Sequence, residues 1–258
     1  MADAGERVPL GFQDHFSAHA EAYARFRPTY PAALFAWLAS LTDRHDLAWD
    51  CGTGNGQAAL ALAEHYASVH ATDPSERQLA QAQPHARVAY RRAAERDSGL
   101  PAACADLVAA AQAFHWFDAT AFFAEAARVL RPGGVLAIWC YGLSTITPEL
   151  DPVVRHFHQG VVGADWPQGR EMVDELYRQV RLPFPEIAPP SLAIERDLDL
   201  AAFGDYVATW SAVQRHRART GRDPLPALLA ELAGPWGDPR TPRRVTWPIG
   251  MRACRAPR

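Results

Sequence analysis

The 258-residue chain carries a net charge of −3, and 48% of its residues are apolar, which is ordinary for a globular protein. Without a basic stripe the chain has no general attraction to nucleic acid or anionic membranes, so we expect neither as a partner. No apolar run approaches a membrane span, and the N-terminus lacks the apolar core of a signal peptide. Four widely spaced cysteines fit neither a zinc site nor a disulfide framework, so we expect a reduced, cytoplasmic chain without a metal.

The first predicted elements are helices. Aromatic and leucine side chains recur at roughly helical spacing over residues 10–45. Pro28 and Pro31 divide this run, because proline interrupts a helix interior. We interpret residues 1–45 as an N-terminal helical lid.

Short apolar runs then alternate with helical patterns. Strands alternating with helices predict a parallel sheet covered on both faces. Ser75 and Asp118 stand at helix N-cap positions, and Phe117 and Phe122 are placed as a hydrophobic staple. We therefore expect a doubly wound α/β fold with a seven-stranded, mostly parallel sheet whose ligand-binding core is residues 46–142. The expected strands are 47–51, 68–72, 87–91, 105–111 and 134–139, and the expected helices are 56–66, 75–82 and 118–130.

The pattern loosens beyond residue 142. The segment 148–181 looks helical and carries aromatic and charged residues. We expect residues 143–182 to form a helical cap inserted before the final strands. Residues 183–258 are expected to complete the core sheet, with strands at 191–199 and 243–254 and helices at 201–219 and 224–233.

The loop after the first expected strand carries the strongest functional signal. Glycines alternate at 52, 54 and 56, where a backbone can turn tightly and approach a ligand at the start of a helix. A dinucleotide fingerprint needs its third glycine at position 57, where Gln57 stands. Asp50 precedes the loop, and a carboxylate suits a cationic ligand better than a pyrophosphate. The loop therefore favours S-adenosylmethionine, which has a sulfonium, an ammonium and no phosphate.

The chain resembles the class I S-adenosylmethionine-dependent methyltransferases, in particular the small-molecule branch of trans-aconitate methyltransferase-like proteins and the methyltransferase type 11 domain. The resemblance spans most of the chain and implies the cofactor S-adenosyl-L-methionine and the product S-adenosyl-L-homocysteine. It is carried by DCGTGNG (50–56), ATDPSERQL (71–79), AAE (93–95), DLVAAAQAFHWFD (106–118), EAARVLRPGGVLAIW (125–139), DHFSAHAEAYARFRPTYP (14–31), TWSAVQRH (209–216) and VTWPIGMR (245–252).

The resemblance also implies a set of cofactor-binding residues. Asp73, at the end of the second strand, is expected to hold the ribose hydroxyls, with capping of the turn at Pro74 as the alternative. A capping box explains Gln78 without a ligand. Many relatives carry aspartate at the position of Glu95, so we expect its contact to differ, and a solvated loop residue is the alternative. Either Arg25 or Arg27 is expected to reach the site, and Tyr23 alternatively belongs to an apolar stripe. The full set is Asp50, Cys51, Gly52, Thr53, Gly54, Gly56, Asp73, Pro74, Gln78, Ala94, Glu95, Gln112, Ala113, Tyr23 and Arg27.

The expected activity is direct transfer of a methyl group to a small molecule, with a carboxylate or hydroxyl oxygen favoured. His115 is a candidate base for a hydroxyl acceptor, whereas a carboxylate needs none; packing between aromatics is its alternative role. The other expected substrate contacts are Trp116, Tyr141, Trp166 and Trp210, with Arg170, Tyr177 and His216 as further rim candidates and core packing as the alternative for each. We expect a monomer or weak homodimer. A non-catalytic S-adenosylmethionine-binding protein and a nicotinamide-dependent dehydrogenase remain alternative functions.

Overall fold

A computed structural model describes residues 28–258 of the chain. The expected lid residues before Pro28, including Tyr23, Arg25 and Arg27, lie outside the described residues.

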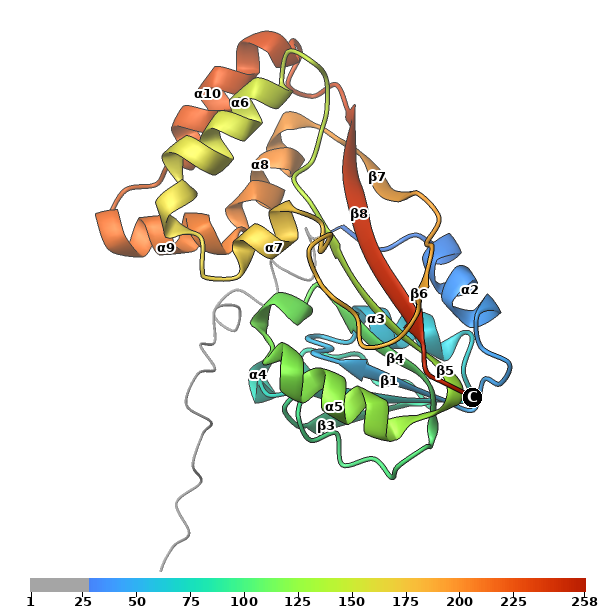
Figure 1. Ribbon diagram of the computed structural model, residues 1–258. Helices are drawn as coiled ribbons and strands as arrows, with labels where there is room; N and C mark the ends of the chain where they lie inside the picture. Colours follow the sequence, from blue (N-terminus) through green and yellow to red (C-terminus); the bar gives the residue numbers. More distant parts are fainter. Residues whose placement is uncertain (1–27) are drawn as a thin grey trace, which may run out of the picture.

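Eight strands form one sheet in the order β3-β2-β1-β4-β5-β8-β6, with β7 also pairing with β8 (Figure 1). The strands are β1 Leu47–Cys51, β2 Ser68–Asp73, β3 Val88–Arg92, β4 Ala105–Ala111, β5 Leu130–Tyr141, β6 Glu186–Ile187, β7 Leu192–Leu198 and β8 Arg243–Arg255.

The doubly wound, mostly parallel sheet that the sequence predicts is confirmed. Strands β1 to β5 pair in parallel, while β5, β6 and β7 all run antiparallel to β8. The described sheet has one strand more than the seven expected. The additional strand is β6, whose two residues follow Pro185 and are too short to leave a strand pattern in the sequence.

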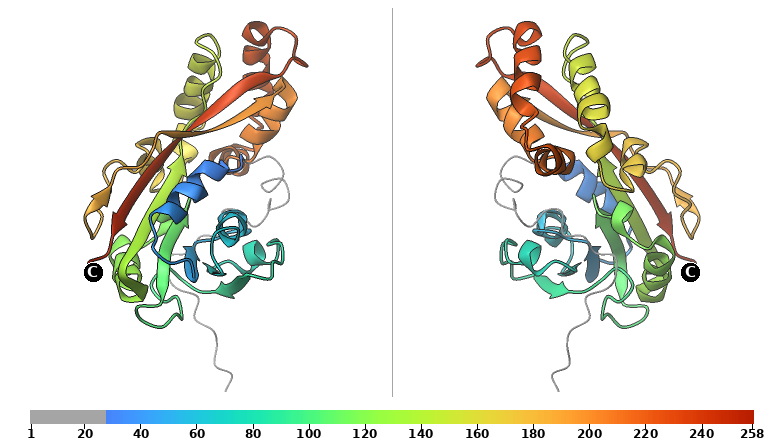
Figure 2. Two further views of the ribbon diagram at one scale, coloured as in Figure 1. Left: turned by 90° about the vertical axis from the view of Figure 1, so that its right-hand side faces the viewer. Right: turned by 90° about the vertical axis from the view of Figure 1, so that its left-hand side faces the viewer.

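Helices cover both faces of the parallel strands, so these strands are apolar on both sides. On one face, α2 (Ala32–Ser40) and α3 (Gln57–Ala63) share an apolar cluster with the sheet. On the opposite face, α5 (Ala119–Val129) packs through a second cluster that contains Phe122. Figure 2 shows α2 and α5 on the two sides of the sheet.

Side-chain caps begin the helices where the sequence predicts. The Ser75 hydroxyl accepts a hydrogen bond from the Gln78 amide at the start of α4 (Glu76–Leu79), and Asp118 caps α5 in the same way. The Phe117 and Phe122 rings lie 5.1 Å apart, which confirms the hydrophobic staple.

A layer of helices lies beyond the edge of the sheet (Figures 1 and 2). The run 148–181 is not one helix, because glycines at 160, 163 and 169 and Pro167 interrupt it. The run 201–219 is also divided, where Trp210 takes an extended conformation. The helices of this layer are α6 Asp151–His156, a π-turn Phe157–Val161, a 3₁₀-turn Gly163–Asp165, α7 Arg170–Asp174, α8 Leu200–Ala208, α9 Ser211–Thr220 and α10 Leu225–Trp236.

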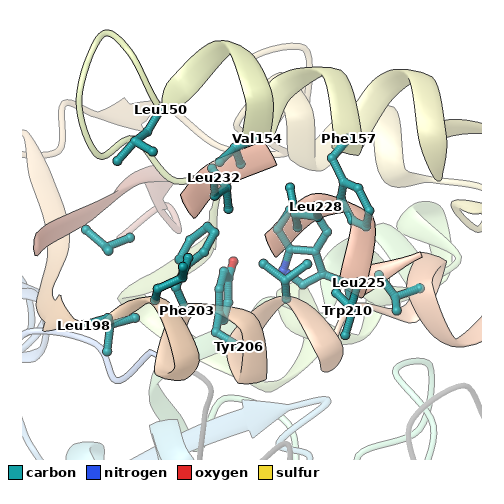
Figure 3. Close-up of a cluster of buried hydrophobic side chains, with 14 of the residues drawn as sticks. Leu150, Val154, Phe157, Leu198, Phe203, Tyr206, Trp210, Leu225, Leu228 and Leu232 are labelled. Carbon is teal, nitrogen blue, oxygen red and sulfur yellow. The ribbon is translucent and has the colours of Figure 1, made fainter. Parts of the chain in front are cut away.

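One apolar cluster holds this helical layer together. In Figure 3, Val154 and Phe157 extend from α6 and the following turn toward Leu228 and Leu232 of α10 and Phe203 and Tyr206 of α8. The helices α8 to α10, which follow β7 in the chain, therefore share a core with the expected cap segment.

The long strand β8 connects the two layers. Its first half pairs with β7 and its second half pairs with β5. Trp247 belongs to the cluster of the helical layer, whereas Met251 belongs to a cluster of the core sheet. One continuous strand thus sets the position of the helical layer relative to the carboxyl ends of the parallel strands.

Candidate functional site

The glycine loop between β1 and α3 needs glycine for two separate reasons. Gly52, Gly54 and Gly56 have φ angles of 69°, 57° and 86°, a region that other residues rarely adopt. A Cβ at Gly52 would lie 2.6 Å from the Cβ of Ala113, and one at Gly56 would overlap the Tyr90 hydroxyl. Within residues 28–258, a Cβ at Gly54 would meet only the Gln78 Oε1, at 4.0 Å. The backbone at Gly54 is therefore open to close approach by a ligand.

The Asp50 side chain lies beneath this loop, and one of its carboxylate oxygens has no hydrogen-bond partner among the described residues. Its side chain is fully buried, and its Oδ2 accepts a hydrogen bond of 2.6 Å from the Thr53 hydroxyl. The described residues offer no hydrogen bond to its Oδ1. Burial raises the pKa of Asp50 to about 7; the Thr53 hydroxyl lowers it, the Asp73 charge raises it, and the Ala59 amide lowers it least. A buried carboxylate oxygen without a donor is costly unless a ligand supplies a cation or a donor.

Asp73 joins the loop to the end of β2. Its Oδ2 accepts a hydrogen bond of 2.9 Å from the Gly54 amide, and its Oδ1 accepts one of 2.8 Å from the Ser75 amide. The capping alternative is thus present in the structure. Each carboxylate oxygen can accept a second bond, so capping does not exclude ligand binding.

The segment after β3 lies beside the same carboxylate. The Ala93 amide donates to the Asp73 carbonyl at 3.3 Å, which places Ala94 next to the end of β2. The charge of Glu95 contributes to the raised pKa of the Cys51 thiol, after the larger effects of burial and of Asp50. The expected cofactor residues on β1, β2 and β3 are therefore neighbours, with Pro74 following Asp73 and the Gln78 side chain facing Gly54.

Gln112 holds the ends of β4 and β5 together. Its φ angle is 54°, which is unusual for a residue other than glycine and marks local strain. Its amide donates to the Trp139 carbonyl at 2.8 Å, and its Oε1 accepts a 2.8 Å bond from the Tyr141 amide. The next residue, Ala113, packs against Gly52, so this strained turn brings β4 to the glycine loop.

His115 follows on a short 3₁₀-helix, Phe114–Trp116. Its Nδ1 lies 2.8 Å from the hydroxyl of Tyr177, which is fully buried. Burial, and then the charge of Arg170, lower the pKa of His115 to about 3, so the ring is neutral at physiological pH. A Cβ at Gly169 would lie 2.5 Å from the His115 carbonyl oxygen, so the start of α7 rests directly on this turn.

The aromatic side chains expected to contact the substrate differ in their burial. Trp116 is 37% exposed beside it, and the guanidinium of Arg170 lies 4.1 Å from the Trp166 ring. Trp210 is buried in the core of the helical layer, 5.7 Å from Trp166. Tyr141 is also buried. The packing alternative therefore describes both of these side chains, and any contact they make with a substrate stays a prediction.

Two residues at the loop carried no signal as site residues in the sequence. The hydroxyl of Tyr90, on β3, covers Gly56 and donates to the Gln83 carbonyl at 3.1 Å. The ring of Phe117 lies against Gly52, where a Cβ would be 2.9 Å from its Cζ. Both contacts depend on how strands and helices are placed in space, which spacing along the chain does not encode.

The sheet order, the glycine loop and the acid at the end of β2 together define a class I methyltransferase fold. Residues 49–138 match the family model described as a methyltransferase domain. A methyltransferase-family protein of Dictyostelium discoideum is 32% identical over 229 residues, which cover 87% of each chain. A solved structure from Anaeromyxobacter dehalogenans, assigned by name to the type II methyltransferases, is 49% identical, covers 90% of this chain and 100% of that one, and has a TM-score of 0.85. The chain belongs to the class I S-adenosylmethionine-dependent methyltransferase family.

Two further features concern residues 28–258 alone. Within them, no helix has both the length and the apolar character that crossing a membrane requires. The same residues contain no group of three His, Cys, Asp or Glu side chains arranged to hold a metal ion.

Proposed function

We propose that the protein transfers a methyl group from S-adenosyl-L-methionine to a small-molecule acceptor, with a carboxylate or hydroxyl oxygen favoured. The observation that carries this proposal is the unsatisfied Oδ1 of buried Asp50 beneath a loop open at Gly54. A cationic ligand without phosphates suits that pairing, because the carboxylate would repel a pyrophosphate.

The residues around the loop fit the parts of this cofactor. Asp50 would face the cationic amino acid end, and the backbone of Gly52, Thr53, Gly54 and Gly56 would lie along the ligand. Bound there, the cofactor would supply a sulfonium methyl group to an acceptor lone pair, and its sulfur would leave as a neutral thioether. The remaining proposed contacts are Asp73 for the ribose, Cys51, Pro74, Gln78, Ala94 and Glu95 for the adenine side, Gln112 and Ala113 near the reacting methyl, and Tyr23 and Arg27 from the lid.

On the acceptor side, the turn after β4 and the start of α7 would orient the substrate. His115 and Trp116 follow the residues proposed to lie at the methyl group, and Arg170 provides a cation beside them. Trp166, Tyr141 and Trp210 complete the proposed acceptor region. Alignment of acceptor and donor is the main contribution of such a site, since the methyl group is already activated.

Binding and turnover experiments test this proposal separately. Calorimetric titration should show binding of S-adenosylmethionine and S-adenosylhomocysteine but not of NAD. Isotope-labelled methyl groups should then appear in one or more members of a metabolite panel rich in carboxylates and hydroxyl compounds. Binding of NAD alone would revive the dehydrogenase alternative. Binding of S-adenosylmethionine with no transfer to any acceptor would support the non-catalytic alternative.

We also infer a cytoplasmic protein that is a monomer or weak homodimer. The location is supported by the four cysteines, all of which are free. Light scattering over a range of protein concentrations tests the oligomeric state.

A further inference from the structure

We propose that Tyr177 fixes the His115 ring as its Nε2–H tautomer, so that His115 donates a hydrogen bond to the methyl acceptor and removes no proton from it. This inference rests on the proposed methyl transfer for the identity of the group that receives the bond. It assigns Tyr177, on the segment after α7, as a positioning residue for the turn after β4.

The hydrogen bonds of the Tyr177 hydroxyl determine the direction of its bond to His115. The hydroxyl is fully buried and lies 2.8 Å from the Nδ1 atom of His115. Burial raises the pKa of Tyr177 well above its usual range, and the backbone of His115 lowers it only in part, so the hydroxyl keeps its proton. If Nδ1 carried the ring proton, the hydroxyl proton would be buried with no acceptor among the described residues. The hydroxyl therefore donates to Nδ1, because leaving a buried donor unpaired is costly.

The neutral state of the ring completes the assignment. Burial and the charge of Arg170 disfavour the imidazolium, so His115 carries one ring proton. With Nδ1 accepting from Tyr177, that proton is on Nε2. A neutral imidazole in this state has no free ring nitrogen with which to accept a proton from a substrate.

The backbone around Tyr177 is built to hold the hydroxyl in place. Leu176 and Tyr177 have φ angles of 55° and 58°, two consecutive left-handed residues that lack the freedom of glycine. Leu176 packs directly against Gly250 of β8, where an added Cβ would overlap the Leu176 backbone. Arg252, also on β8, donates to the carbonyls of Tyr177 and Arg178 at 3.0 and 2.7 Å. Such strain persists only where the surrounding structure enforces it, and it is commonly found at functional sites.

The other end of the imidazole is available to a ligand. The described residues make no hydrogen bond to Nε2, which lies on the opposite side of the ring from the Tyr177 contact, and His115 keeps some exposed surface. Arg170, which is paired with Asp174 at 2.9 Å, is close enough for its charge to act on His115. A donor beside a cation suits an acceptor oxygen that is already ionised, as in a carboxylate. A hydroxyl that must lose a proton would find no base in His115.

The tautomer can be measured directly by long-range ¹H–¹⁵N correlation spectra of the imidazole rings, with His115 assigned from its absence in His115→Gln. Wild-type protein should show the Nε2–H tautomer at His115. Tyr177→Phe should shift His115 toward Nδ1–H or a mixture of tautomers. Tyr66→Phe is the matched control, since it removes a buried hydroxyl bonded to Thr42 away from the site, and it should leave the His115 signals unchanged. An Nδ1–H tautomer in the wild type, or no change in Tyr177→Phe, would overturn the proposal.

Methyl transfer to a panel of small carboxylates and the corresponding alcohols tests the donor role. A glutamine amide can donate near the Nε2 position but cannot act as a base. We therefore expect turnover of carboxylates, with His115→Gln retaining several-fold more activity than His115→Ala. Turnover of alcohols that both variants lose equally would identify a base and contradict the donor role. If no panel member is methylated, the proposed function fails, while the spectra still decide the tautomer.

Discussion

The amide of Gly54 donates a 2.9 Å hydrogen bond to the Oδ2 of Asp73, which joins the glycine loop after β1 to the end of β2. The other oxygen of Asp73 accepts from the Ser75 amide at the start of the next turn. One carboxylate therefore holds both segments, and the open face of Gly54 is organised before any ligand arrives. Preorganisation of this kind lowers the ordering cost of binding.

Gly54→Ala should weaken binding of S-adenosylmethionine about tenfold or more while leaving the fold intact. The new methyl group meets no atom of the described residues closer than 4.0 Å, so its main effects are the cost of a φ angle of 57° and obstruction of the ligand. Gly221→Ala is a matched control, because Gly221 has a φ angle of 68° and open space around it at the end of α9. Thermal denaturation should show similar losses of stability for the two variants. Equal cofactor affinity for both, measured by calorimetry, would show that no ligand approaches Gly54.

The affinity for S-adenosylmethionine should rise with pH up to about 7 and level off above it. Without ligand the pKa of Asp50 is about 7, and a bound cation lowers it, so binding below pH 7 releases a proton. Calorimetry in buffers of different ionisation enthalpy measures that proton directly. Asp50→Asn should remove both the proton release and the slope and should bind more weakly above pH 7. A wild-type affinity that does not change between pH 5.5 and about 7.5 would contradict a cationic contact at Asp50.

The contribution of Asp50 to the stability of the ligand-free protein should fall as the pH rises, whereas the affinity for the cofactor should rise. The pKa of Asp50 rises from 3.8 in the unfolded chain to about 7 in the folded one. Its neutral form therefore favours folding below about pH 4, and this contribution is lost as the pH rises through 7. Asp50→Asn should become more stable relative to the wild type by roughly 2–4 kcal/mol between pH 4 and 8, as followed by urea denaturation. A constant difference between the two proteins would show that Asp50 is not buried in its neutral form.

Features encoded by neighbouring residues were predictable from the sequence. Ser75 and Asp118 cap helices that begin within three residues of them, and the glycines at 52, 54 and 56 all adopt positive φ angles. These features depend on local backbone chemistry, so no knowledge of the fold is needed to find them. The parallel core followed from the alternation of strands and helices for the same reason.

Features that depend on contacts between distant segments were not predictable. The stacking of Tyr90 on Gly56 requires the register of β3 on β2, and that of Leu176 on Gly250 requires the path of the chain after α7. The segment 148–181 looked helical in the sequence, but the positions at which it divides into α6, α7 and the turns between them were not predicted. Tyr177 was one of several rim candidates in the sequence, and only the structure shows that its hydroxyl lies within hydrogen-bond distance of His115.

Glu125→Gln should destabilise the protein and loosen the segment that carries Glu95. Glu125, on α5, accepts hydrogen bonds from the Ser98 amide and hydroxyl at 2.8 and 2.5 Å, and Arg128 donates to both of its oxygens at 2.7 Å. Arg128 first, and then Ser98, lower the pKa of Glu125 to about 2 despite its burial, so its contribution is present above pH 4.5 and is lost as the pH falls toward 2.

The expected loss at pH 7 is about 1–3 kcal/mol in urea denaturation, and the difference from the wild type should shrink at acidic pH. Hydrogen exchange should show faster opening of residues 94–98 in the variant, because Ser98 loses its charged acceptor. Glu76→Gln is the control, since the Glu76–Arg92 pair is mostly exposed and such pairs contribute about 0–1 kcal/mol. If both variants lost the same stability, or if exchange at 94–98 were unchanged in Glu125→Gln, the anchoring role of Glu125 would be wrong.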